Sequence, residues 1–141
     1  MAAADLNTIR STIEGRLATE LAGSPVLPVV FHNMAYEPTP GSSWVQCQTS
    51  FGANEYLGHG LTSSGYTRIL GQMVINIFTP KGTGPGANYV IGKRVRDLYN
   101  SVIVSGVFFD ASTGPEVLAS PAPEGYFQTQ VRVTFESIEE L

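Results

Sequence analysis

The residues best suited to phosphate chemistry lie in one glycine-rich segment, Gly82-Thr83-Gly84-Pro85-Gly86. The segment follows a strand-like stretch and precedes a helix-like one, which is where backbone N–H groups can bind a phosphate. However, a P-loop needs a Lys followed by Ser or Thr at the helix start, and Ala87 and Asn88 occupy those positions. The dinucleotide fingerprint needs its third glycine one residue later. These departures favour a plain strand-to-helix connection, with a nucleotide site as the minor alternative.

Other nucleophiles and metal ligands are few and isolated. His32 and His59 are the two histidines, and neither belongs to an HExxH pattern. Cys47 is the single cysteine, so neither an intrachain disulfide nor a cysteine-based metal cluster can form. Because Cys47 falls on the inward side of an alternating segment, a buried inert thiol is favoured over a Cys–His pair. We therefore predict no catalytic residue, no metal and no cofactor.

Composition points to a single domain with covered surfaces. The chain has 141 residues, 43% hydrophobic, but only 14% are charged, against roughly 25% in typical domains. This deficit predicts that other subunits cover much of the surface. The formal charge of -4 disfavours nucleic-acid binding. The N-terminus lacks signal-peptide features and no apolar run reaches the length of a membrane span, so we expect a soluble, unexported protein.

Two segments have helical periodicity. Apolar residues recur at steps of three and four from Leu6 to Leu21, in a helix that begins near Asp5 or Asn7. We expect Gly23 to end this helix in the left-handed conformation. A second apolar sector runs from Ala87 to Val102, with Arg94 at its edge, where its side chain would snorkel to solvent.

Strand patterns fill most of the remaining chain. We predict an edge strand at Val26–Phe31, a half-buried strand at Trp44–Phe51 and a long central strand at Tyr66–Thr79. Two short strands are expected at 107–111 and 116–120, joined by a Ser-Thr-Gly-Pro turn. A clearly alternating strand follows at Phe127–Phe135, and the end at 136–141 is expected to fray. The predicted fold class is α+β, a mostly antiparallel sheet with two helices packed on one face, in one domain over residues 1–141.

Residues 52–65 show neither the helical periodicity nor the two-residue alternation of a strand, and we predict a flexible loop there. Tyr56, Leu57 and Leu61 would be poorly placed in water, so we expect them at a protein interface. A hairpin tip whose apolar residues fold back on their own chain is the alternative. For Tyr56 both possibilities stay open, whereas for Tyr99 core burial is favoured over an interface.

The run from Tyr66 to Gly84 resembles the central motif of tail terminator proteins of long-tailed bacteriophages. In that family an Arg, here Arg68, and a Gly three residues on, here Gly71, open a strand that leads into a Lys-Gly-x-Gly turn, here at Lys81, and then an amphipathic helix. The first helix and the Gly125-Tyr126 pair before the last strand agree with this pattern. The resemblance covers nearly the whole chain.

The resemblance implies a structural virion protein and no enzyme. It implies a homo-oligomeric ring, expected to be a hexamer, that caps the tail tube, ends its polymerisation and docks the head-completion, or stopper, protein. The ring would be assembled in the host cytoplasm and lie at the head-proximal end of the tail, and viral DNA would pass through its lumen without sequence-specific binding. The alternatives are another neck, connector or tail tube subunit and, more remotely, a small nucleotide-binding enzyme. The candidate interface residues are Asn54, Glu55, Tyr56, Leu57, Leu61, Arg68 and Lys81.

Overall fold

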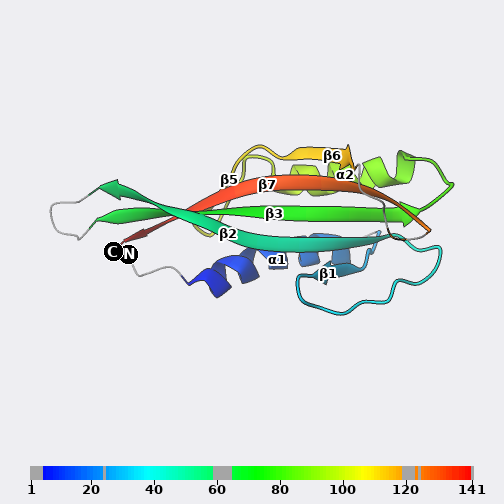
Figure 1. Cartoon of the computed structure of the whole chain (residues 1–141), viewed down its shortest axis with the longest axis horizontal. Helices are drawn as coiled ribbons and strands as arrows, with labels where there is room; N and C mark the ends of the chain where they lie inside the picture. The colour runs from blue at the N-terminus through cyan, green and yellow to red at the C-terminus, as the bar shows by residue number, and fades with distance from the viewer. Residues whose placement is uncertain (1–4, 24, 59–64, 119–122, 124, 141) are drawn as a thin grey trace.

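Three long strands form the centre of one sheet. The computed structural model describes residues 5–23, 25–58, 65–118, 123 and 125–140. Strands β2 (Trp44–Gly58), β3 (Tyr66–Pro80) and β7 (Tyr126–Glu140) have 15 residues each and lie side by side (Figure 1). β3 pairs antiparallel with β2 on one side and with β7 on the other. The prediction of a long central strand from Tyr66 is confirmed.

Four short strands extend this sheet. β1 (Val29–Phe31) pairs in parallel with β2 and forms an edge, as predicted for this segment. β5 (Val107–Phe109) pairs with β7, and β4 (Ile103–Val104) pairs with β5. The strand order is therefore β1-β2-β3-β7-β5-β4, and β6 (Thr113–Val117) pairs with β7 beside β5.

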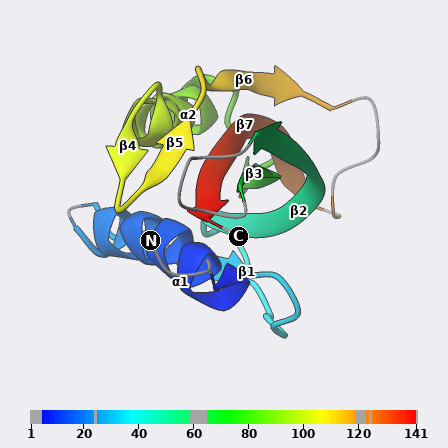
Figure 2. The same ribbon diagram turned by 90° about the vertical axis from the view of Figure 1, so that its left-hand side faces the viewer.

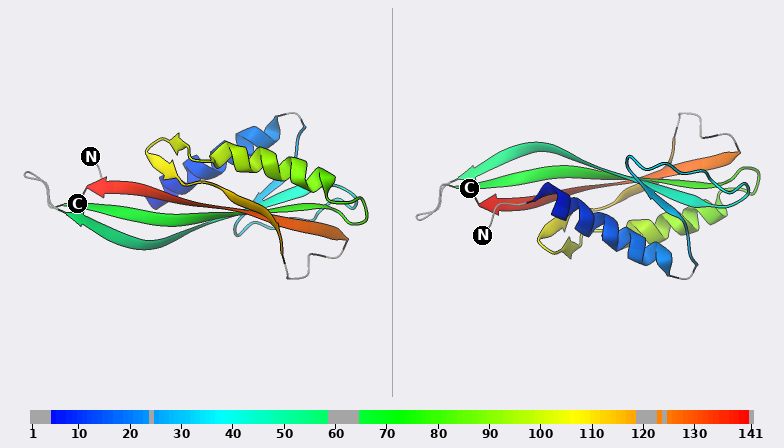
Figure 3. Two further views of the ribbon diagram at one scale, coloured as in Figure 1. Left: turned by 90° about the horizontal axis from the view of Figure 1, so that it is seen from above. Right: turned by 90° about the horizontal axis from the view of Figure 1, so that it is seen from below.

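Both helices cover one face of the sheet, which confirms the predicted α+β class (Figures 2 and 3). α1 (Leu6–Ala22) and α2 (Gly86–Tyr99) contribute apolar side chains to a core shared with the long strands. Residues on alternate positions of the strands face this core. Its fully buried members include Ile13, Leu17, Leu21, Val45, Cys47, Met73, Ile75, Ile77, Val95, Tyr99, Val131 and Phe135.

The structure differs from the predictions at two residues near the helix ends, Gly23 and Arg94. Gly23 has a φ of -78° and is extended, so the expected left-handed cap is wrong; its N–H instead donates to the Glu20 carbonyl. Arg94 does more than extend to solvent, because its Nε bonds Glu20 Oε1 at 2.9 Å and its Nη1 donates to the Pro25 carbonyl at 2.8 Å. Arg94 thus joins α2 to the carbonyl end of α1, where a cation is favourable.

Tyr99 is a core residue, as predicted. Its side chain is fully buried, and its hydroxyl donates to the Ile13 carbonyl of α1 at 2.7 Å. Its ring packs on Phe109, with centroids 5.1 Å apart. Tyr99 thereby connects both helices and the sheet.

The predicted loop at 52–65 is wrong for its first half. Residues 52–58 belong to β2, and residues 59–64 lie outside the described part of the chain. The register against β3 shifts between Phe51 and Asn54 and again between Tyr56 and Gly58. Each bulge adds one residue to β2 and exchanges the faces on which the following side chains lie. Two such exchanges within seven residues explain why this strand shows no period of two.

Other boundaries also differ from the predictions. The end at 136–141 was expected to fray, yet Glu136 to Glu140 continue β7 in register with β3. A Ser-Thr-Gly-Pro turn was expected between the two short strands, but Thr113 to Pro115 of this segment belong to strand β6. α2 ends at Tyr99, so Val102 lies beyond it. Strand β4 was not predicted, because two residues are too few to show a period.

Gly71 lies where a side chain does not fit, and this predicts a stability loss in Gly71→Ala. A Cβ there would lie 2.3 Å from Cζ of Phe135, a ring held by Phe51 and Phe109. We expect Gly71→Ala to reduce the free energy of unfolding by about 1–3 kcal/mol, measured by urea denaturation.

Gly15→Ala is the matched control. Gly15 is exposed on α1, and a Cβ there would meet nothing within 4 Å. Alanine at this position should therefore be neutral or stabilise by up to about 1 kcal/mol. Equal unfolding midpoints for Gly71→Ala and the wild type would contradict the close contact with Phe135.

Candidate functional site

The face of the sheet that the helices leave uncovered carries uncharged polar side chains along its middle. We call this the helix-free face. Because Met73, Ile75 and Ile77 point into the core, the residues between them point the other way. In the middle of the sheet this face is formed by Gln46, Gln48, Ser50, Gln72, Val74, Asn76, Gln128, Gln130, Arg132 and Thr134. Five of these ten side chains are glutamines and one is an asparagine, so this part of the surface is predominantly amide.

Asn76 links the amides of three strands. Its Nδ2 donates to Gln46 Oε1 at 3.2 Å, and its Oδ1 accepts from Nε2 of Gln128 and of Gln130, each at 3.0 Å. Asn76 is 6% exposed, and these bonds satisfy its polar atoms. The network cross-links the three strands in the middle of the helix-free face through uncharged groups.

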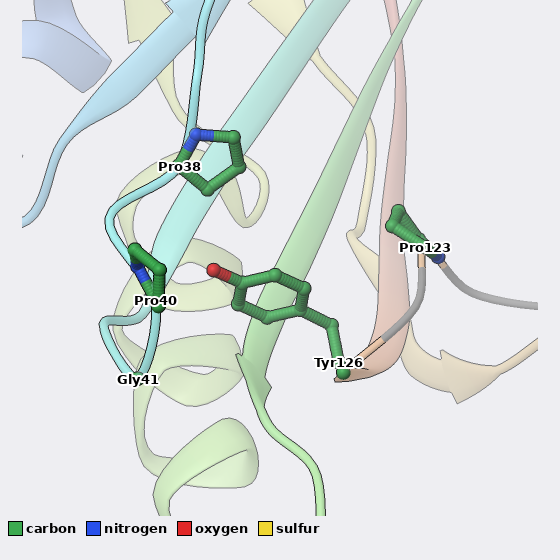
Figure 4. A pocket seen from close by; sticks show the side chains of 6 residues that line it. Pro38, Pro40, Gly41, Pro123 and Tyr126 are labelled. Atoms are coloured by element: carbon green, nitrogen blue, oxygen red, sulfur yellow. The ribbon is translucent and has the colours of Figure 1, made fainter.

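Aromatic residues form one end of this face. Trp44 stacks on Phe78 with centroids 4.1 Å apart, and Tyr126 meets both rings edge-on. The Tyr126 hydroxyl donates to the Thr39 carbonyl at 3.3 Å. Figure 4 shows the Tyr126 ring directed toward Pro38 and Pro40, in a pocket of about 430 Å³ that Gly41, Pro123 and Gly125 complete.

The opposite end of the sheet is a projecting arm that carries most of the predicted interface residues. We use "arm" for residues 52–58 of β2 and 65–70 of β3, which extend past the helices (Figure 1). Asn54, Glu55, Tyr56 and Leu57 are all exposed there. Arg68 lies directly across from Glu55. Five of the seven candidate residues therefore come together.

The other two candidates do not join the arm. Lys81 follows β3 at the far end of the sheet, in the turn before α2. Leu61 lies outside the described residues.

Arg68 bridges three strands. Its Nη1 lies 2.9 Å from Glu55 Oε2 on β2, and its Nε lies 2.9 Å from Glu136 Oε2 on β7. Its side chain is 34% exposed, so water screens each pair and each contributes about 1 kcal/mol or less. Because the arm lies beyond most of the core, these pairs still restrict how its strands move relative to β7.

Tyr56 and Leu57 are the large apolar side chains of the arm. They are 55% and 42% exposed. The Tyr56 ring lies over Gly65, where a Cβ would come within 2.8 Å of Tyr56 Cε1. Part of the ring is thus packed on its own hairpin, which is the alternative stated from the sequence, and the rest faces solvent.

Two further exposed apolar residues continue the helix-free face at the base of the arm, and sequence reasoning did not single them out. Ile103 and Phe108 are 67% and 39% exposed and pair across β4 and β5. Phe108 lies opposite Glu136, which lies opposite Leu70. No polar/apolar alternation was available as a signal, because Val107, Phe108 and Phe109 are all apolar.

The glycine-rich turn serves to connect β3 to α2. Gly82 and Gly84 have φ values of 89° and 82°, which glycine adopts without strain. Just inside α2, the buried Asn88 Nδ2 donates to the carbonyls of Ile77 and Phe127 at 3.1 and 3.3 Å. These bonds attach the start of the helix to β3 and β7, as expected for a plain connection.

Cys47 is fully buried on β2, as predicted. Burial, together with the nearby Glu14 carboxylate, raises the pKa of its thiol from 9.0 to about 12, against a smaller lowering by a hydrogen bond from Thr49. The neutral thiol therefore prevails near pH 7, and it packs as an apolar group.

Neither a membrane-spanning helix nor a metal cluster occurs among the described residues. No helix there is long and apolar enough to cross a membrane. No group of three or more His, Cys, Asp and Glu side chains gathers in that part of the chain in an arrangement that could hold a metal ion.

Comparison with known proteins gives a related fold but no family. No protein-family model matches the chain, and no curated protein matches it. A solved structure with 15% sequence identity superposes with a TM-score of 0.61 over 97% of this chain and 96% of its own. At this level of identity the similarity shows the fold alone.

The raised pKa of Cys47 predicts a specific pH dependence. The unfolded chain releases the thiol proton near pH 9.0, whereas the folded chain keeps it up to a pH of about 12. The thiol's contribution to stability is therefore full below pH 9 and decreases as the pH rises above it. We expect Cys47→Ser to cost at most about 3 kcal/mol near pH 7, measured by urea denaturation.

The difference in unfolding free energy between the wild type and Cys47→Ser should shrink between pH 9 and 11. A thiol reagent should label the native protein far more slowly than the urea-unfolded chain. Rapid labelling of the native protein at pH 7 would show that Cys47 is accessible and would contradict its role as a buried, inert thiol in the core.

Proposed function

We propose that this chain is the tail terminator subunit of a long-tailed bacteriophage. Copies of it form a ring, a hexamer in this proposal, that caps the tail tube, stops its growth and presents a docking surface to the head-completion protein. It acts by binding rather than by catalysis. Its location is the virion, at the head-proximal end of the tail.

The observation that carries the proposal is the arm. It places Tyr56 and Leu57 in solvent beside the Glu55–Arg68–Glu136 bridge. Exposed aromatic and aliphatic side chains within a polar rim are typical of protein interfaces. An arm that projects from a compact body can reach a neighbouring subunit or the tube.

The residues of the terminator-like motif have roles that support the proposal. Arg68 bridges the strands of the arm, and Gly71 leaves room for Phe135 where the arm joins the body. The Lys-Gly-x-Gly turn at Lys81 directs the chain from β3 into α2. Each motif position thus serves the geometry of the sheet and its arm, which suits a structural protein.

In this proposal the helix-free face lines the lumen. Its middle is predominantly amide, with one cation, Arg132, paired to Glu116 at 2.9 Å. Such a surface offers few unpaired charges that would retain DNA phosphates during passage. The 14% charged fraction of the chain fits subunits that cover one another's remaining surface.

Tail tubes of the same phage, assembled with and without this chain, test the function. We expect the wild type to bind tube ends and stop elongation, as seen by electron microscopy. The double variant Tyr56→Ser/Leu57→Ser should bind tube ends at least about thirtyfold more weakly, because interface anchors each contribute roughly 1–3 kcal/mol.

Val26→Ser is the matched control. Val26 is 71% exposed and lies outside the arm, so this variant should cap tubes as the wild type does. Full capping by the double variant would exclude the arm as the interface. Incorporation of the wild type along the whole tube would favour the tube-subunit alternative, and failure to bind tubes at all would contradict the proposed function.

A further inference from the structure

β2 has a long free edge on the side away from β3. On this side β1 pairs with β2 only from Val45 to Cys47, and the described residues place no strand beside β2 from there to Gly58. Long free edges normally carry a protective residue such as Lys or Pro. The stretch from Gln48 to Gly58 has neither. Its two bulges, which also protect an edge, lie beyond Phe51, so the edge is regular and open from Gln48 to Phe51.

The other edges of the sheet are protected. β1 has three residues and β4 has two. β6 contains Pro115, and the carbonyl of Gly114 already accepts a hydrogen bond from Arg96 at 2.8 Å. β7 is also unpaired on its side away from β3 at residues 126–128 and 138–140, but these stretches are short, so β2 has the longest open edge in the described part of the sheet.

The backbone groups of Thr49 point toward this open edge. The N–H of Val45 donates to the Pro28 carbonyl at 3.0 Å, on the β1 side of the strand. Backbone groups alternate between the two edges of a strand. The N–H groups of Cys47, Thr49 and Phe51 therefore face the same side as that of Val45, whereas those of Gln48 and Ser50 face β3.

A groove lies along this edge where β1 ends. It has a volume of about 380 Å³ and is bounded by α1, β2 and the turn after β1, through Arg10, Glu14, Phe31, His32, Asn33, Met34 and Thr49. Asn33, with a φ of 65°, turns the chain away from β2. α1 continues past the end of β1 toward the arm (Figure 1). The groove therefore lies next to β2, in line with β1 and beyond its end.

The polar groups of the groove favour an uncharged occupant. Arg10 and the buried Glu14 neutralise each other at 2.7 Å. The Thr49 hydroxyl is buried beside the Cys47 sulfur, which is a weak acceptor, and the described part of the chain offers it no oxygen or nitrogen partner. A buried hydroxyl in this state gains from an added polar partner.

We propose that this groove accepts an extended segment of the tail-tube protein, which adds to β2 as a strand collinear with β1. Only an extended backbone matches the spacing of the exposed N–H and C=O groups on a strand edge. The identity of the partner rests on the proposed function. A second copy of this chain is disfavoured, because its other edges are protected and pairing two β2 edges would close a two-fold dimer rather than a ring.

Hydrogen exchange and one pair of variants test the proposal. The full chain is measured alone and bound to tail tubes. We expect the Thr49 and Phe51 amides to exchange rapidly in the free chain and slowly in the bound one. Thr49→Pro removes the outward N–H without removing a hydrogen bond to β3, so it should weaken tube binding about tenfold. Thr49→Val keeps the outward N–H and loses only the hydroxyl, so it should weaken tube binding less than Thr49→Pro does.

Each outcome separates this inference from the proposed function. If the wild type caps tubes without protection of Thr49 and Phe51, the groove is not the docking site while the function stands. Protection in a concentrated sample of the chain alone would identify a second copy as the occupant and overturn the proposal. If Thr49→Pro fails to fold, as judged by urea denaturation, the exchange of the wild-type amides decides.

Discussion

The antiparallel ladder between β3 and β7 is the constraint on which the rest of the structure depends. It runs without a register shift from Tyr66 opposite Glu140 to Pro80 opposite Tyr126. β2 is attached to β3, β5 and β6 are attached to β7, and both helices cover the face that these strands share. The ladder also reaches into the arm, where the core is sparse, so the arm depends on these hydrogen bonds and on the Arg68 bridge. Gly71 lies against the ring of Phe135 at the point where the arm joins the body. A substitution there should therefore destabilise both the body and the arm.

The two faces of this ladder have different tasks. One buries Met73, Ile75 and Ile77 beneath the helices and supplies the hydrophobic stabilisation. The other presents amides that satisfy one another through Asn76. A sheet with one covered and one open face usually carries charged residues on the open side. Here uncharged amides occupy its middle, and this accounts for part of the low charged fraction without requiring a partner on every surface.

The sequence predicts the fold wherever one strand face is buried and the other is not. That condition holds for Trp44–Phe51 and for Phe127–Phe135, and both segments are strands. It fails at 52–58, where bulges shift the register, and at the end of β7, where charged residues pair with the β3 strand of the arm. Tyr56 and Leu57 were found as apolar side chains in a segment without periodicity, and Arg68 was found from the family resemblance. The pairing of Arg68 with Glu55 and Glu136 could not be predicted, because it depends on the register between three strands. The groove beside Thr49 arises where β1 ends and α1 continues, a relation between distant segments that no local pattern encodes.

Central to the proposed function is that copies of this chain assemble as a ring at one end of a tail tube. Cryo-electron microscopy of tubes mixed with the purified chain tests this assembly most directly. We predict a single ring of density at the head-proximal end, with the arm in contact with a neighbouring subunit or the tube and the helix-free face toward the lumen. Bare tube ends, or density spread along the tube wall, would contradict it.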